Sequence, residues 1–168
     1  MQWLINVLNW VGETPLALAI AESEWLFPTI EVVHVFAISL VFGSIAIIDL
    51  RLLGLASANR RYTEMAHELL PLTWGAFVVA AFFGTLLIAS RPVAYFGNTD
   101  LRLKFLCMGL AGVNMLVFQF ITSRNVEQWD KGGAPLAGKV AGGLSLVFWI
   151  GVVYFARMTG FTLVQGGA

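Results

Sequence analysis

The two histidines of the chain, His34 and His67, each follow a glutamate by three positions, in Glu31-Val-Val-His34 and Glu64-Met-Ala-His67. Residues three positions apart share one face of a helix, so the members of each pair can act together. Bundles that bind two metal ions combine two such Glu-x-x-His motifs with two further glutamates. The residue types alone therefore suggest a metal centre.

A shared centre requires both motifs at one depth, and the surrounding sequence predicts otherwise. His34 lies early in one apolar stretch, whereas His67 precedes the next. In antiparallel helices the two imidazoles would lie about 20 to 30 Å apart at a rise of 1.5 Å per residue. The two later apolar stretches, 101–122 and 137–159, also contain no glutamate. We therefore expect separate roles for the two histidines.

Haem b offers a second kind of chemistry, because a histidine can be its axial ligand. His34 is the first candidate, since Met158 near the end of the last apolar stretch is expected at a similar depth and could be the second ligand. A pair of His34 residues across a dimer would also serve. His67 is a further candidate, without an evident facing ligand. The simpler alternative is that both histidines only form hydrogen bonds within the bundle.

Other polar residues also stand in apolar surroundings, where an ionisable group costs about 2.5 to 3.5 kcal/mol on insertion scales. We expect Glu31 to pair with Lys104, and Asp49 to pair with a basic residue near the same membrane surface, while Arg51 extends to the headgroups. Asn114 is expected to bond across helices. These residues form the predicted buried polar cluster, near the outer face: Glu31, His34, Asp49, Arg51, Lys104 and Asn114.

The elements that carry these residues are membrane helices. Apolar residues make up 58% of the 168, and only 12% are charged, with a mean hydropathy of +0.80, whereas soluble domains are about a quarter charged. Stretches 28–53, 69–90, 101–122 and 137–159 are long enough to span a bilayer, the second with an extension toward Tyr62. Short connections favour antiparallel neighbours. We predict one all-α domain, 28–168, as an integral membrane four-helix up-down bundle.

Residues 1–27 predict one or two short amphipathic helices at the membrane interface. Apolar residues gather on one face of the first, and Thr14-Pro15 is typical of the start of a second. An alternative is that this segment packs on the rim of the bundle. A secretory signal peptide begins with a basic region, but residues 1–26 contain no Lys or Arg. We therefore expect the N-terminus to be retained.

Basic residues are biased weakly toward one side of the predicted membrane. Six of them, Arg51, Arg60, Arg61, Arg124, Lys131 and Lys139, fall on one side, and four on the other. The positive-inside rule then places both termini outside the cytoplasm. The basic residues are scattered and balanced by ten acidic ones, so we expect no nucleic-acid partner.

Several short motifs resemble an uncharacterised family of small four-helix bacterial inner-membrane proteins. They are Glu31-Val-Val-His34 with Ser39 and Gly43, Asp49-Leu-Arg-Leu-Leu-Gly54, Lys104-Phe105 and Asn114. The resemblance covers most of the chain from Pro28 onward and implies a bacterial inner membrane, but no activity. More distantly, a histidine early in a four-helix module is similar to copper-resistance CopD proteins and b-haem membrane modules, which would implicate His34.

Small residues recur at helical spacing on two stretches, namely Ala76, Ala80 and Gly84, and Gly138 with Gly142. Such faces let membrane helices approach closely. Our leading interpretation is therefore an accessory or structural protein, homo-oligomeric through these faces, with lipid as its other partner. A haem or metal-binding electron-transfer module is the alternative. A small transporter or channel is less favoured, because no inverted repeat or pair of broken helices is found.

Overall fold

The computed structural model describes residues 2–57, 59–130 and 133–165, the side chains of 164 and 165 aside. In this part every regular element is helical: α1 (Gln2–Gly12), α2 (Pro15–Glu22), α3 (Leu26–Leu53), α4 (Tyr62–Ser90), α5 (Pro92–Gly97), α6 (Thr99–Val117), α7 (Val126–Trp129) and α8 (Leu136–Gln165). A π-helix, Phe118–Thr122, and a short 3₁₀ turn join α6 to α7. Lys131, one of the six basic residues expected on one side of the membrane, lies outside the described residues.

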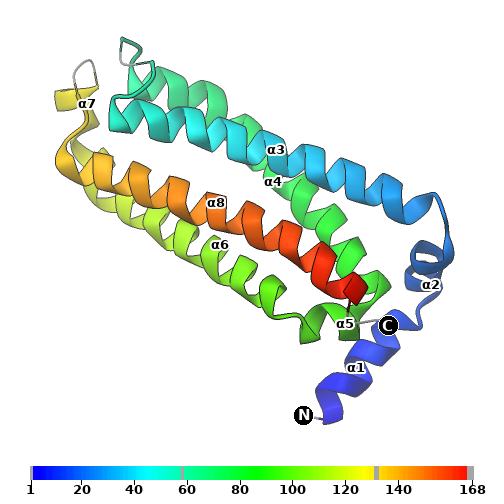
Figure 1. Cartoon of the computed structure of the whole chain (residues 1–168). Helices are drawn as coiled ribbons and strands as arrows, with labels where there is room; N and C mark the ends of the chain where they lie inside the picture. The colour runs from blue at the N-terminus through cyan, green and yellow to red at the C-terminus, as the bar shows by residue number, and fades with distance from the viewer. Residues whose placement is uncertain (1, 58, 131–132, 166–168) are drawn as a thin grey trace.

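Four helices are long and apolar enough to cross a membrane: Leu26–Leu53, Tyr62–Ser90, Thr99–Trp129 and Leu136–Leu163. The predicted all-α bundle is confirmed, and the chain is a small multi-pass membrane protein. The second span begins at Tyr62, so the polar turn ahead of residue 69 continues the helix. Pro71 lies inside α4 without ending it. Figure 1 shows α1 and the end of α8 at the same end of the bundle.

The four long helices pack as two antiparallel hairpins. α3 packs along α4 and α6 packs along α8, and contacts between α3 and α8 join the two pairs (Figure 1). α4 and α6 make almost no contact with each other. The helix backbones are therefore in close contact along three sides of the bundle and lie further apart along the fourth, the seam between α4 and α6.

Small residues set the closest approaches between these helices. A Cβ at Gly142 would lie 3.1 Å from the backbone oxygen of Asp49 on α3, and one at Gly151 would lie 3.0 Å from the sulfur of Cys107 on α6. Ala76 and Ala80 of α4 are buried. The predicted small-residue faces thus serve contacts within the chain. The homo-oligomer stays a prediction, and its contacts would have to use other surfaces.

Arg51 does not extend to the headgroups, and that expectation was wrong. Its side chain is 1% exposed. Nε donates to the backbone oxygen of Arg60 at 2.7 Å and Nη2 to that of Asp130 at 3.2 Å. Backbone carbonyls of two connections hold the guanidinium, because both connections fold back over the end of α3. The arginine thereby ties the α3–α4 and α7–α8 connections together.

Asp130 completes this closure from the other direction. Its carboxylate accepts the backbone N–H of Thr63 at 2.9 Å and the Thr63 hydroxyl at 2.7 Å. These are first-turn groups of α4, which otherwise lack partners and favour negative charge. Burial acts to raise the pKa of Asp130, but the hydrogen bonds from Thr63 and the nearby charge of Arg61 outweigh it, so the net pKa is lowered.

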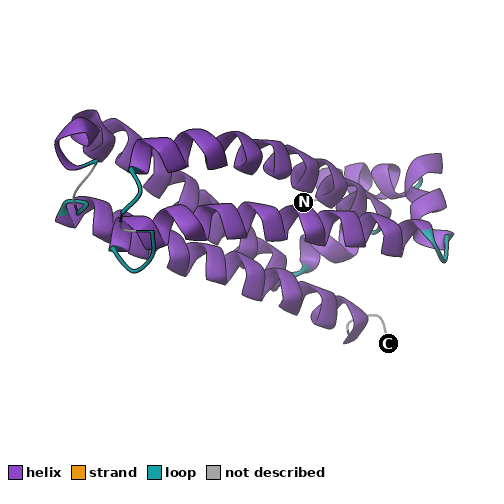
Figure 2. Cartoon of the chain, turned by 90° about the horizontal axis from the view of Figure 1, so that it is seen from above, coloured by secondary structure: helices purple, strands orange, loops and turns teal. Residues whose placement is uncertain are grey.

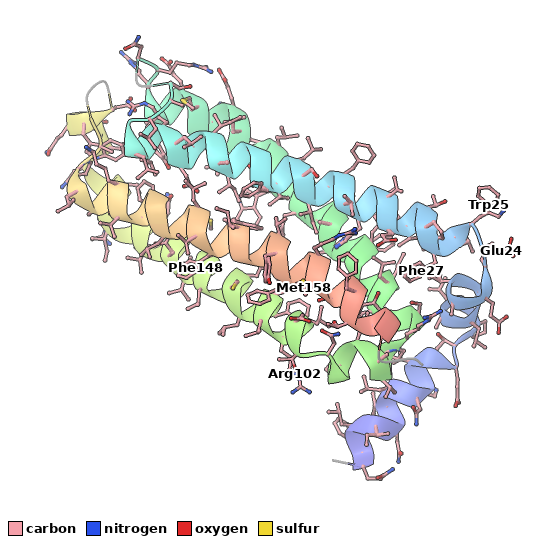
Figure 3. All side chains as sticks on the ribbon, viewed as in Figure 1. Glu24, Trp25, Phe27, Arg102, Phe148 and Met158 are labelled. Carbon is pink, nitrogen blue, oxygen red and sulfur yellow. The ribbon has the colours of Figure 1, made fainter. Side chains whose placement is uncertain are left out.

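The N-terminal helices pack at the opposite end, where α3 begins. α1 contacts α5 and α2 contacts α4, and the two are bent by 68° at the Thr14-Pro15 cap. Ile20 of α2 is buried with Ile30 and Leu87. Figure 2 gives the end of the bundle from a second direction, and Figure 3 shows Trp25 extending away from it. This segment therefore packs on the bundle's rim, and its interfacial role stays a prediction.

Candidate functional site

A cavity of about 430 Å³ lies among all four long helices. It occupies the half of the bundle nearer the α3–α4 connection. Its lining is mostly apolar and aromatic, with a few polar side chains. The lining residues are Val41, Ile45, Ile48, Asp49, Leu52, Tyr62, Leu70, Thr73, Trp74, Phe77, Met108, Ala111, Gly112, Asn114, Met115, Phe118, Gln119, Ala141, Ser145 and Trp149.

The π-helix after α6 shapes one wall of this cavity. Phe118 and Gln119, its first two residues, both line the cavity. One extra residue per turn widens a helix locally, and such π segments recur at functional sites. Phe118 is buried, and its ring meets Tyr62 edge-on with centroids 5.6 Å apart. The widened turn thus brings an α6-side aromatic residue against the start of α4.

The cavity is closed toward the nearer end of the bundle and open at its side. Tyr62 packs on both Phe118 and Trp129, the latter with ring centroids 5.4 Å apart, and Leu52 joins the same buried group. On the seam between α4 and α6, by contrast, Trp74 is 51% exposed and Met115 41% exposed. In a membrane this seam faces lipid. Lining residues of α4 and α6 are thus exposed on the lipid-facing seam, whereas those at the bundle's end are buried.

Asp49 is the polar residue of the lining whose hydrogen bonding is incomplete. It is 5% exposed, and its Oδ2 has no hydrogen-bond partner among the described residues. The Ser145 side chain of α8 faces this carboxyl, and the Tyr62 hydroxyl of α4 is close enough to sense its charge. Gly142 allows α8 to approach α3 at this level. The ion pair that we expected for Asp49 is not formed within the described part of the chain.

The neighbouring polar groups are already bonded. Asn114 Nδ2 donates to the backbone oxygen of Ala141 at 2.9 Å, so the predicted bond across helices is formed. Thr73 Oγ1 donates to the backbone oxygen of Leu69 at 2.8 Å and shares a 2.7 Å hydrogen bond with Ser44 of α3. An unbonded buried carboxyl oxygen costs several times more than such satisfied groups. Asp49 therefore stands apart chemically from the rest of the lining.

His34 lies in the other half of the bundle, about 20 Å along α3 from Asp49. Its Nδ1 donates to the backbone oxygen of Ala80 at 2.7 Å. A Cβ at Gly84 would lie 2.7 Å from His34 Cε1, so the imidazole rests directly on the backbone of α4. Lys104 of α6 is close enough to act on the imidazole electrostatically.

Glu31 does not join this group. Its side chain is exposed and forms no ion pair with Lys104 among the described residues. It lies instead near Tyr95 of α5. Burial raises the pKa of the Tyr95 hydroxyl, the Glu31 carboxylate raises it further, and Arg91 lowers it. The predicted cluster thus divides into His34 with Lys104, Asp49 with Asn114 in the cavity, Arg51 beyond it, and Glu31 at the surface.

The three predicted haem ligands do not meet at the cavity. None of His34, His67 and Met158 lines it. His67 is exposed on the first turns of α4, about 25 Å along that helix from the Gly84 level at which His34 packs. The two Glu-x-x-His motifs are therefore far apart, as expected. In the described part of the chain no group of three or more His, Cys, Asp or Glu could hold a metal ion. Haem binding stays a prediction without a geometric site.

Sequence reasoning missed most of the cavity's polar and aromatic lining. Ser145, Tyr62 and Trp149 were not singled out, and Asp49 was assigned to the interface rather than to a cavity. One signal was present: Asp49 falls four and eight positions after Ile45 and Val41, on one helical stripe. Without knowledge of which stripe faces inward, that spacing identifies no site.

No protein-family model, curated protein or solved structure matches this chain. The resemblance to small bacterial inner-membrane proteins therefore stays a prediction. Functional argument rests on the cavity, its open seam and the Asp49 carboxyl.

Proposed function

We propose that this protein binds a small amphiphilic molecule, taken from the bilayer, in the cavity between its four long helices. The observation that carries this proposal is the cavity itself, about 430 Å³ in volume and open along the α4–α6 seam. Binding sites for small molecules typically have volumes of about 300 to 1,000 Å³, apolar walls and a few placed polar groups. A molecule dissolved in lipid can enter by the seam without crossing water.

A binding role accounts for two features that a purely structural bundle does not need. Protein interiors are close-packed, so selection for stability alone favours side chains that fill this volume. A buried carboxyl oxygen without a partner adds a further cost. Strain and unsatisfied groups of this kind concentrate where function requires them. An accessory role through ligand binding therefore explains the site better than a scaffold role.

We further propose that the bundle lies in a bacterial inner membrane with both termini outside the cytoplasm. Arg51, Arg60, Arg61 and Arg124 belong to the end that holds the α3–α4 connection, and basic residues favour the cytoplasmic side. The cavity then lies in the cytoplasmic half. Reporter fusions in the α3–α4 connection and after α8 test this orientation. A reporter that is active only in the cytoplasm should be active in the α3–α4 connection, and one that is active only outside the cytoplasm should be active after α8.

Binding is tested with a neutral probe of matched shape, a para-bromophenyl alkane that ends in a tert-butyl group. Bromine quenches tryptophan fluorescence at short range, and Trp74 and Trp149 line the cavity. Purified protein in lipid nanodiscs is titrated with the probe. We expect a saturable component of quenching that Trp149→Phe reduces.

Two leucine variants then locate the binding. Gly112 lines the cavity, and a Cβ there meets no atom within 4 Å, so Gly112→Leu adds a side chain at the cavity wall without a clash of its first carbon. Gly109 of the same helix is equally open but does not line the cavity, and Gly109→Leu is the matched control. Gly112→Leu should weaken probe binding about tenfold, or 1.4 kcal/mol, with no change in the control. Equal saturable quenching in both variants would reject the proposed site.

A further inference from the structure

The Asp49 carboxyl has three properties that together define a ligand class. It is 5% exposed, it lines the cavity, and its Oδ2 has no hydrogen-bond partner in the described part of the chain. An isolated carboxylate in an apolar site is strongly disfavoured, so the group either takes up a proton or pairs with a cation. A cation that entered the cavity would find in Asp49 a carboxyl group with one oxygen unpaired.

The described residues do not supply that cation inside the cavity. No Lys, Arg or His is among the residues that line it. Arg51 lies two positions along the chain, but its Nε and Nη2 are directed to the backbone oxygens of Arg60 and Asp130. Ser145 offers a hydroxyl, which is neutral. A cation that pairs with Asp49 inside the cavity would accordingly have to belong to a bound molecule.

The rest of the lining suits an organic cation better than a metal ion. Tyr62, Trp74, Phe77 and Trp149 present aromatic rings to the cavity, and ring faces attract ammonium groups by about 0.5 to 2 kcal/mol each. A metal ion needs several oxygen ligands, whereas Asp49 is the one acidic residue of the lining, and no group of three or more His, Cys, Asp or Glu in the described part of the chain could hold one. The lining thus offers one acidic side chain, Asp49, among aromatic rings, aliphatic side chains and a few neutral polar groups.

We propose that the occupant of the cavity is a small organic cation, an amine or quaternary ammonium compound with an apolar body, whose charged nitrogen lies against Asp49. This inference rests on the proposed binding function and adds the chemical class of the ligand. The apolar body lies among the aromatic side chains, and the positive charge pairs with the Asp49 carboxylate, with an added hydrogen bond to Oδ2 where the nitrogen carries a hydrogen. A molecule of this kind also partitions into lipid headgroups, from which the α4–α6 seam is accessible.

The test compares two probes that differ only in charge. One is para-bromophenethyl-trimethylammonium, and the other is the neutral probe described above, in which carbon replaces the quaternary nitrogen. Each is titrated in nanodiscs against the wild-type protein, and against Asp49→Asn and Asp49→Glu. The affinity for the cation is divided by the affinity for the neutral probe, which removes the effect of shape because the two probes have the same shape. Each probe partitions equally into the membrane in every variant, so a change of this ratio between variants does not reflect partition.

The wild-type protein should prefer the cation, and Asp49→Asn should lower the affinity ratio about tenfold or more, the value of one charge-assisted contact. Neutral-probe binding by Asp49→Asn shows that this variant is folded. Asp49→Glu keeps the charge and should keep the preference. Should Asp49→Asn fail to fold, a wild-type protein without any cation preference is enough to overturn the inference.

The two proposals fail in different ways. If neither probe gives saturable quenching that Gly112→Leu reduces, the proposed binding function is wrong. If both probes bind in a manner sensitive to Gly112→Leu but the affinity ratio is the same with Asp49 and with Asn, the function stands and the cation inference is overturned. A ratio that falls equally in the Glu and Asn variants also overturns it, since charge then plays no part.

Discussion

The contact of Gly84 with His34 gives a double-mutant prediction. The effect of Gly84→Ala on stability should change sign when His34 is replaced by alanine. A methyl group at residue 84 would place its carbon 2.7 Å from His34 Cε1 and 3.2 Å from Nδ1. The imidazole cannot keep its position, and when it moves it gives up the 2.7 Å hydrogen bond to Ala80. Gly84→Ala should therefore destabilise the bundle although alanine is the better helix former.

The magnitude follows from three contributions. Overpacking costs about 1 to 3 kcal/mol, and the lost hydrogen bond about 1 kcal/mol. The change from glycine to alanine in a helix returns about 1 kcal/mol. The net destabilisation by Gly84→Ala is then about 1 to 3 kcal/mol. In a His34→Ala background the first two contributions vanish, so the same substitution should stabilise by up to about 1 kcal/mol.

The assay is reversible unfolding in mixed micelles, followed by helical circular dichroism, for the wild type, both single variants and the double variant. The expected coupling energy is about 2 to 4 kcal/mol. Gly75→Ala is the matched control, because it lies on the same helix and a Cβ there meets no atom within 4 Å. It should be neutral or slightly stabilising. An equal cost of Gly84→Ala with and without His34 would refute the packing described here.

Two further predictions concern stability. The pKa of Asp130 is lowered in the folded state. Its contribution to stability is therefore complete above the unfolded pKa of about 3.9 and is lost as pH falls through the folded pKa. Asp130→Asn should flatten this acid dependence of the thermal midpoint, and an unchanged profile would contradict the prediction. Gly142→Ala should cost about 1 to 3 kcal/mol, because its Cβ would lie 3.1 Å from a backbone oxygen that cannot move alone. Gly160→Ala, in open space on the same helix, is its control, and equal unfolding midpoints in the two variants would count against this contact.

The number and order of the spanning helices could be predicted because length and apolar composition are strong signals in a membrane. Their ends were less predictable. The extension of the second span toward Tyr62 was expected and α4 begins there, but the cap on its first turn, Asp130 from a distant connection, was not foreseen. A side chain supplied by another part of the chain leaves no local signal.

The site was harder, for a physical reason. In a soluble helix one face is apolar and the other polar, but in a bilayer lipid-facing and core-facing sides are both apolar. The spacing that puts Asp49 on one helical face with Val41 and Ile45 was therefore visible in the sequence. Whether that face points into the bundle or toward lipid was not. Close approach is set by small residues, and Gly142 opposite Asp49 was seen only as a packing motif. The ionisable residues were found from the sequence, but their grouping depended on depth and rotation.

The π-helix of residues Phe118–Thr122 has a consequence for how the chain tolerates insertions and deletions. Each residue of an α-helix turns the chain by about 100°, and a π turn accommodates one residue more than an α turn. Removal of one residue within the π-helix would therefore convert it to an ordinary turn and leave the segment beyond it in nearly the same rotational register. Trp129 would keep its place against Tyr62, and Asp130 would keep its place at the start of α4. A deletion in the regular part of α6 would instead rotate both residues away by about 100°. The wide turn is thus where this helix can lose a residue while the closed end of the cavity keeps its contacts.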